Sequence, residues 1–478
     1  MNGPQTMPDS RNRPSRVDAA LAALARRREQ TLEQLAELVR IPGVSAAGFD
    51  AAALEASARK VAEVLSAAGL ERVEVLHHGA APPFVVAEWS CPTPGAPTLL
   101  IYGHHDVQPP GDLSRWLSPP WEPEQREGRL YGRGVVDDKA GIMAQVAAVR
   151  AWMDTPDGPP VNLKFIIEGE EEIGSPHLEA FLSAHARRLA ADCLLLTDTC
   201  NLDTGVPSLT TSLRGLVVAD VAVASLEGPL HSGIWGGPIP DPVQALARIL
   251  ARLSDERGRP AVPGIDWPQP PPGMHDDLPF DAERFRAQGG VLPGVPLLTQ
   301  GGAETCWSMW NAPVITVSAL DAPPLAGSSN QIVARVRARV GLRLAPGQDA
   351  EKCRDALVAC LENAPPWGCR VEVTPHTAAG GWETRPDHPS HAPVFAAARR
   401  ALEAGYGHPA AFIGCGGSIP FVEPFARALG GVPALLLGVE DPPCRAHGEN
   451  ESLHLGDFDK ACRATVHLFA EVAAAAKN

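Results

Sequence analysis

Short apolar segments alternate with helical segments between residues 98 and 197, and this alternation constrains the fold more than any other feature. Strands are predicted at Thr98–Tyr102, Leu163–Glu168 and Cys193–Thr197, with helices at Gly141–Met153 and Ser175–Ala184. Strands that alternate with helices of this length form a largely parallel sheet covered on both faces. Such sheets bind ligands beyond the carboxyl ends of their strands. We therefore predict an α/β domain with its functional site at that edge.

The pattern changes near Arg214 and returns after about Pro386. The intervening elements are predicted as strands at Leu216–Val223, Val314–Ala319, Gln331–Leu344 and Cys369–Thr374, and helices at Asp241–Leu253 and Asp349–Glu362. Two halves of this β-α-β kind predict a small, ferredoxin-like α+β domain. The expected organisation is a disordered tail (1–16), a metal-binding domain (17–213 and 386–478) and an inserted lid and dimerisation domain (214–385). One helix over Val17–Arg40 is expected to open the larger domain.

Charge and composition limit the classes of binding partner that are expected for this chain. Its 478 residues are too many for one ordinary core, which favours two domains. A net charge of -15 repels phosphate backbones, so nucleic acid is not an expected partner and small molecules or peptides are. No apolar run is long enough to cross a membrane. The ten cysteines form no C-x-x-C pair and are expected to be reduced thiols, which predicts a cytoplasmic location.

Histidine and acidic side chains cluster after the predicted strands or in the loops near them. The clusters are His104-x-Asp106, residues 137–138, residues 170–172, Asp198 and residues 447–451. Any one of these pairs alone is more typical of a solvated surface. Six or seven oxygen and imidazole ligands from separate strand ends are more than one zinc ion needs. Two metal ions that share a carboxylate would use them all.

The tight turn Tyr131–Gly134 lets the backbone approach closely, so Asp137 is the expected bridging carboxylate. One metal ion would take His104 and Asp198 in addition, and the other would take Glu172 and His447. Mixed imidazole and carboxylate ligation makes zinc the default, with manganese or cobalt as alternatives.

Two carboxylates outside this ligand set have expected roles. Glu171 is adjacent to a ligand and is free to accept the proton of a metal-bridging water, which makes it the expected general base. Asp106 is expected to orient His104 by bonding its second ring nitrogen.

Several motifs closely resemble the dinuclear metallopeptidases of the carnosinase and cytosolic nonspecific dipeptidase type. They are YGHHDVQP (102–109), LYGRGVVDDK (130–139), EGEEEIGS (168–175), LHSG (230–233) and GGSIP (416–420). The wider family includes carboxypeptidase G, succinyl-diaminopimelate desuccinylase and aminoacylase. The resemblance extends from about residue 20 to the C-terminus and implies the same two metal ions, ligands and base.

The resemblance also implies roles for residues that chemistry alone does not single out. His231 would reach the active site of the partner subunit in a homodimer and stabilise the oxyanion of the tetrahedral intermediate. Arg343 would clamp the carboxylate of the substrate. His376 matches a further lid histidine near the substrate, and Ser418 matches the serine beside the carboxylate site.

The chain departs from this family pattern at three places. Gly414-Cys415 stands where many dipeptidases of this type carry Arg-Glu, and Ile332 replaces a threonine that commonly contacts substrate. The spacing from His376 to Trp382 is one residue longer than in the family. These departures leave the fine substrate preference open.

Three functions are compatible with the sequence. The first is hydrolysis of dipeptides or short peptides with a free C-terminal carboxylate. The second is an N-acyl or N-carbamoyl amino acid amidohydrolase, because the same two-metal water attack serves any amide whose carbonyl can bridge the ions. The third is an inactive binding or scaffolding subunit, which would require a lost ligand or base, and none is missing.

Overall fold

The computed structural model describes residues 15–476 apart from 418–421, 423–424 and 426–428. Residues 1–14 of the predicted tail therefore lie outside the described residues. The first helix, α1 (Arg16–Arg26), begins immediately after Ser15, whose side chain accepts a hydrogen bond from the backbone N–H of Asp18 and caps the helix.

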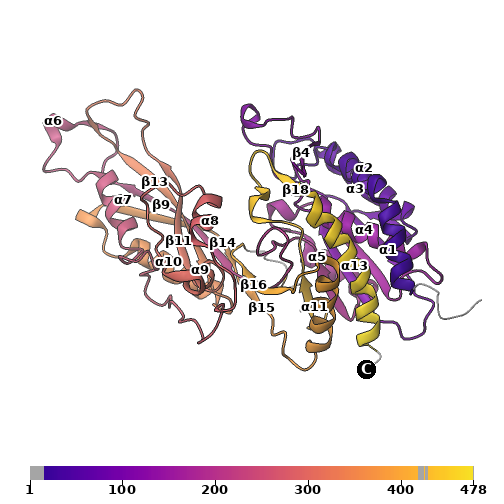
Figure 1. Ribbon diagram of the computed structural model, residues 1–478. Coiled ribbons are helices and arrows are strands. Elements are labelled where there is room, and N and C mark those ends of the chain that lie inside the picture. The colour runs from indigo at the N-terminus through magenta and orange to yellow at the C-terminus, as the bar shows by residue number, and fades with distance from the viewer. Residues whose placement is uncertain (1–14, 418–421, 423–424, 426–428, 477–478) are drawn as a thin grey trace, which may run out of the picture. The chain divides into compact units, whose positions relative to one another are not determined.

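The chain packs into two compact units, which are shown in Figure 1. The first unit consists of Met1–Thr210, Arg385–Phe412 and Pro424–Asn478, and the second of Thr211–Thr384 and Ile413–Glu423. The two units are defined by the packing of the chain. The functional division into a metal-binding domain (17–213 and 386–478) and a lid and dimerisation domain (214–385) stays a prediction.

The first unit is built on a mixed sheet in the order β1-β2-β6-β3-β7-β17-β8. The strands are β1 (Glu71–Leu76), β2 (Phe84–Trp89), β3 (Thr98–His104), β6 (Asn162–Glu168), β7 (Cys193–Leu196), β8 (Ser208–Leu213) and β17 (Ala434–Leu436). The central strands β6, β3, β7 and β17 are parallel, whereas β1, β2 and β8 pair in antiparallel fashion. The prediction of an α/β fold around a mostly parallel sheet is confirmed.

Helices pack against this sheet and against one another. They are α1, α2 (Arg28–Val39), α3 (Ala51–Ala67), α4 (Lys139–Met153), α5 (Leu178–Leu189), α11 (Ala392–Tyr406) and α13 (Leu455–Ala475). Helix α4 is buried along nearly its whole length because it contacts β3 as well as α1, α2 and α13. The core of the unit therefore lies around α4, directly behind the strand that carries His104.

The predicted single helix over Val17–Arg40 is wrong, since α1 ends and α2 begins around Arg27. The backbone of Arg27 leaves helical geometry (φ -100°, ψ 5°). Its guanidinium binds Asp154 with N–O distances of 2.9 Å. This contact depends on a residue far along the chain, and the leucine spacing of the two helices does not reveal it.

A small antiparallel sheet joins two loops that matter for the site. It has the order β18-β5-β4, from β4 (Glu124–Arg126), β5 (Arg129–Tyr131) and β18 (Ser452–His454). Tyr131 pairs with Ser452 in this sheet. The chain that leads to Asp137 therefore runs beside the chain that follows His447.

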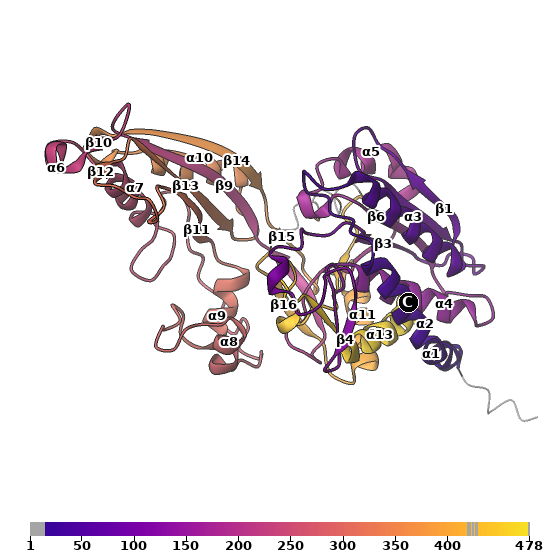
Figure 2. The same ribbon diagram turned by 90° about the horizontal axis from the view of Figure 1, so that it is seen from above.

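The second unit contains a four-stranded antiparallel sheet in the order β11-β13-β9-β14 (Figure 2). Its strands are β9 (Gly215–Ala224), β11 (Val314–Asp321), β13 (Arg335–Leu344) and β14 (Arg370–Ala379). Helices α7 (Pro242–Ala251) and α10 (Ala350–Glu362) pack on this sheet. The buried side chains of β9 and β13 and of both helices form one core, as expected for an α+β domain.

Shorter elements complete the second unit. They are β10 (Leu230–His231), α6 (Ser232–Trp235), α8 (Ala282–Gln288), α9 (Gly301–Trp310), β12 (Gln331–Ile332), β15 (Trp382–Glu383) and β16 (Ala411–Cys415), which starts in the first unit. The single strand predicted over Gln331–Leu344 is wrong, because β12 separates from β13 and pairs with β10.

Among the described residues, no helix is both long and apolar enough to cross a bilayer. The ten cysteines, all within the described part of the chain, form no disulfide.

Candidate metal centre

Strand β3 delivers His104, its last residue, into a buried position. The Nδ1 atom of His104 lies 3.1 Å from the backbone oxygen of Asp106 and 3.4 Å from the Asp106 carboxylate. The Nε2 atom lies 3.0 Å from Oδ1 of Asp137. Because Asp106 occupies the Nδ1 side, Nε2 is the nitrogen that faces the other acidic side chains.

Asp137 lies between two histidines and offers one oxygen to each. Its Oδ1 contacts His104, and its Oδ2 lies 2.9 Å from Nε2 of His447. The same His447 nitrogen is 3.1 Å from Oε2 of Glu172, and Asp198 Oδ2 is 3.8 Å from Nε2 of His104. A carboxylate placed in this way has the arrangement of a bridging ligand.

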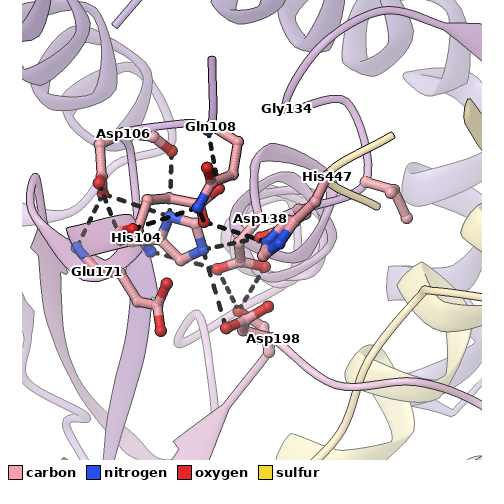
Figure 3. Close-up of polar contacts among 12 residues, drawn as sticks. His104, Asp106, Gln108, Gly134, Asp138, Glu171, Asp198 and His447 are labelled. Carbon is pink, nitrogen blue, oxygen red and sulfur yellow. Dashed lines mark hydrogen bonds and ion pairs between the residues drawn. The ribbon is translucent and has the colours of Figure 1, made fainter. Parts of the chain in front are cut away.

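Figure 3 shows the convergence of His104, Asp198 and His447, with the side chain of Glu171 beside His104. Two sets of possible metal ligands result, each with its donor atoms within 4.8 Å of one another. The sets are His104, Asp137 and Asp198, and Asp137, Glu172 and His447. Both sets contain Asp137.

The 3₁₀ turn η3 (Glu171–Ile173) follows β6 and is held by Asp106. The Asp106 carboxylate accepts hydrogen bonds from the backbone N–H groups of Glu171 (3.2 Å) and Glu172 (3.1 Å). Gln108 then fixes the Glu172 carboxylate through its backbone N–H (3.0 Å) and its side-chain amide (2.8 Å). Asp106 therefore positions both the histidine and the turn that carries the expected base.

Glu451 holds the loop that carries Asp137, a role that sequence reasoning missed. Its carboxylate accepts hydrogen bonds from the backbone N–H groups of Gly134 (2.9 Å), Val136 (3.0 Å) and Asp137 (3.4 Å). Gly134 has φ +74°, and a side chain at this position would overlap Val107. The glycine is therefore required by the close approach of the loop.

Arg133 connects this loop to the one that carries His447. It forms a buried ion pair with Glu451 (2.7 Å) and donates to the backbone oxygens of His447 and Gly448, each at 3.1 Å. The pairing of charged residues 318 positions apart leaves no local signal in the sequence. Two signals in the sequence could have drawn attention to them, since Arg133 lies inside the motif LYGRGVVDDK and Glu451 inside the acidic cluster 447–451.

The acidic side chains of the site perturb one another. Burial raises the pKa of Glu171 and of Asp198, and the surrounding carboxylates raise both further. Hydrogen bonds to Asp137 and Glu172 raise the pKa of His447 to about 11. Burial opposes a charge on His104, but hydrogen bonds to Asp106 and Asp137 raise its pKa. So many carboxylates in one buried place call for cations to balance them, and the donor set fits two divalent ions.

A second buried carboxylate lies behind the site. Glu168, the last residue of β6, accepts hydrogen bonds from the hydroxyls of Tyr102 and Ser175 (2.9 Å for Ser175). Its other oxygen, Oε2, has no hydrogen-bond partner among the described residues. Burial raises the pKa of Glu168 to about 8, and the charge of Asp106 contributes to the rise. Sequence reasoning assigned Glu168 no role.

The remaining predicted residues belong to the second unit. His231 ends β10 and is exposed, and its Nδ1 accepts a hydrogen bond from the backbone N–H of Gly233 (3.1 Å). Arg343 lies near the end of β13 and is partly buried. The register of β14 shifts between Pro375 and Thr377, so His376 is an extra residue in a β-bulge.

The bulged His376 places its Nε2 atom 2.9 Å from the Asp220 carboxylate, which also binds Arg339 at 2.7 Å. Ser418 lies outside the described residues.

Comparisons with known proteins show which family the chain resembles in sequence and in fold. Residues 100–471 match the model of peptidase family M20/M25/M40. The chain is 33% identical over 364 residues to the cysteinylglycine-S-conjugate dipeptidase of Corynebacterium striatum, covering 76% of this chain and 78% of that protein. It is 28% identical over 409 residues to the Beta-Ala-His dipeptidase of Homo sapiens, covering 82% and 78%. The crystal structure of human carnosine dipeptidase 1 superposes with a TM-score of 0.84 at 25% identity, over 96% of this chain and 99% of that one.

An α/β domain that gathers histidine and carboxylate side chains in two candidate ligand sets at the carboxyl edge of its sheet fits the class of metal-dependent hydrolases. The chain belongs to peptidase family M20/M25/M40. The expected resemblance and the prediction of a metallopeptidase are confirmed.

Proposed function

We propose that this enzyme hydrolyses the amide bond of dipeptides or short peptides that carry a free C-terminal carboxylate. The proposal rests on the position of Asp137, whose carboxylate offers one oxygen to His104 and the other to His447. A carboxylate shared in this way would allow the surrounding side chains to hold two cations. The names of similar proteins, which are dipeptidases for Cys-Gly and Beta-Ala-His peptides, support the choice of substrate class.

In this proposal each subunit holds two divalent metal ions. His104, Asp137 and Asp198 would hold one, and Asp137, Glu172 and His447 the other. Zinc is the default, and manganese or cobalt would suit the same ligands. When bound, such ions lower the pKa of water and polarise a substrate carbonyl.

Glu171 is the proposed general base. It lies on the same turn as Glu172 but belongs to neither ligand set. Its carboxylate would take the proton of the attacking water and pass it to the leaving amine. Burial raises the pKa of Glu171, which favours the transfer of a proton to it.

Arg343, His376 and Ser418 are proposed to bind the substrate, with Arg343 on its carboxylate. His231 is proposed to act in the partner subunit of a homodimer, where its imidazole would stabilise the oxyanion. Two apolar side chains beside it support a subunit contact, since Ile234 is 72% and Trp235 48% exposed and a partner would cover them. The cytoplasmic location stays a prediction.

The test is a substrate panel with the metal-loaded protein. Dipeptides should be cleaved faster than N-acetyl and N-carbamoyl amino acids that carry the same C-terminal residue, and prolonged chelation should abolish the activity until metal is restored. Faster cleavage of the acyl or carbamoyl compounds would favour the amidohydrolase alternative. Full activity after chelation, with the metal shown to be absent, would overturn the proposal.

A further inference from the structure

The two strands that lead to His104 and Asp198 pair with each other for only part of their length. Strand β3 pairs with β7 from Leu99 and Cys193 to Tyr102 and Leu196, and the pairing ends there although β3 continues to His104. The paired segments thus stop two residues before His104 and two residues before Asp198. The spacing between these two side chains is set by something other than the backbone pairing of β3 with β7.

The carboxylate of Asp138 lies at this end of the two strands. Its Oδ2 atom accepts hydrogen bonds from the backbone N–H of His104 (3.3 Å) and from the hydroxyl of Thr197 (3.1 Å). The same hydroxyl lies 3.3 Å from Oδ1 of Asp138 and 3.3 Å from the backbone oxygen of Tyr102. One carboxylate therefore joins the backbone of His104 to the residue that immediately precedes Asp198.

Two glycines leave room for the Asp138 carboxylate, which is fully buried. A Cβ atom on Gly103 would lie 2.6 Å from Oδ2, and a Cβ atom on Gly141 would overlap Oδ1. A side chain at either position would therefore displace the carboxylate from the two strands. The close packing holds Asp138 in one position, which is what a residue that orients metal ligands requires.

We propose that Asp138 is a positioning residue for one of the two metal ions, the ion assigned to His104, Asp137 and Asp198. The inference rests on the proposed function, which assigns these ligands. His104 and Asp198 belong to this ligand set alone, and Asp138 binds the backbone of the first and the chain neighbour of the second.

The other ligand set is held by different residues. Gln108 binds the carboxylate of Glu172, and Glu451 binds the loop that carries the shared ligand Asp137. The loss of the Asp138 hydrogen bonds should therefore weaken the binding of one ion and spare the other.

The experiment measures zinc binding at each ligand set separately in the full-length protein. Asp198→Ala leaves only the set of Asp137, Glu172 and His447 complete, and Glu172→Ala leaves only the set that contains His104. Each of these two variants should therefore bind one ion. Calorimetric titration of the chelator-treated protein with Zn²⁺ gives the affinity for that ion.

Asp138→Ala is then combined with each of these two variants. The affinity for zinc should fall by about 10–100-fold in the Glu172→Ala protein, because a residue that orients metal ligands is lost, and by less than about threefold in the Asp198→Ala protein. Equal losses in the two proteins, or no loss in either, would overturn the inference.

Asp138→Asn is the matched control, because asparagine is as neutral as alanine but keeps an oxygen acceptor. An amide oxygen in the position of Oδ2 can accept both hydrogen bonds. In the Glu172→Ala protein, Asp138→Asn should therefore bind zinc at least about tenfold more tightly than Asp138→Ala. Equal affinities of the two neutral variants would show that these hydrogen bonds do not support the ion and would overturn the inference.

Thr197→Val tests the same contact from the other strand and decides the question if Asp138→Ala does not fold. Valine has the shape of threonine without the hydroxyl, so one of the two hydrogen bonds is lost. Zinc binding should weaken about three- to tenfold in the Glu172→Ala protein and stay unchanged in the Asp198→Ala protein. Thr197→Ser keeps the hydroxyl and should bind zinc normally. Unchanged affinity in both Thr197→Val proteins would overturn the inference.

Peptide cleavage separates this inference from the proposed function. If zinc binding depends on Asp138 in this way but the zinc-loaded, unmodified enzyme cleaves no dipeptide, the positioning role stands and the proposed function fails. If the enzyme cleaves dipeptides but Asp138→Ala weakens both ions equally, only the positioning role fails.

Discussion

At the scale of single residues, Glu171 carries the proton transfer in the proposed reaction. Glu171→Gln should retain both metal ions, because Glu171 is in neither ligand set, and should lower kcat by about 10²–10⁴. Metal content and kcat would be measured together. Glu179→Gln, on the exposed side of α5, is the control and should have ordinary activity. More than about one-tenth of the original kcat in Glu171→Gln would show that the base is misassigned.

Glu168 leads to a second prediction at this scale, concerning pH. Burial raises the pKa of Glu168 from 4.5 to about 8, so the folded protein favours its protonated form. The contribution of Glu168 to the free energy of unfolding is therefore fully present below about pH 4.5 and is lost as the pH rises through about 8. Relative to Glu168→Gln, the free energy of unfolding should fall by about 2–5 kcal/mol over this range. Denaturant unfolding of both proteins at several pH values would check it, and parallel pH profiles would contradict it.

At the scale of elements, the two loops of the metal centre depend on the Glu451–Arg133 ion pair. Glu451→Ala leaves the Arg133 charge buried and removes the acceptor for the Asp137 loop. We expect a loss of about 3–5 kcal/mol in the free energy of unfolding and 10–100-fold weaker metal binding. Chelator competition and thermal unfolding would measure the two effects. Glu449→Ala in the same loop is the control, since among the described residues the Glu449 carboxylate makes only long contacts of 3.4 Å, with Arg115 and with the backbone N–H of Asp112. A folded Glu451→Ala protein that binds metal normally would refute this role.

At the scale of the whole molecule, the proposed sharing of His231 between subunits can be tested by mixing. His231→Ala and Glu171→Gln should each be nearly inactive, because one lacks the oxyanion donor and the other the base. In a mixed dimer, the site that retains Glu171 would receive His231 from its partner. Random exchange makes about half of the dimers mixed, each with one intact site, so about a quarter of the original activity should return. Exchange would be verified with differently tagged chains, and mixed dimers that remain inactive would show that His231 does not act across the interface.

The sequence alone determined the type of fold and the side chains that gather at the metal centre. Strand and helix periods are local, and His104 and Glu172 each follow an apolar strand by a fixed number of residues. The carboxyl ends of parallel strands meet at one edge of the sheet, so these local patterns place His104, Glu172 and Asp198 at the same edge.

Only the tertiary structure decided how those side chains are held. The interruption at Arg27, the bulge at His376 and the Glu451–Arg133 pair all depend on contacts between segments far apart in the chain. Burial and long-range pairing set the charge of a group, and no local spacing encodes them.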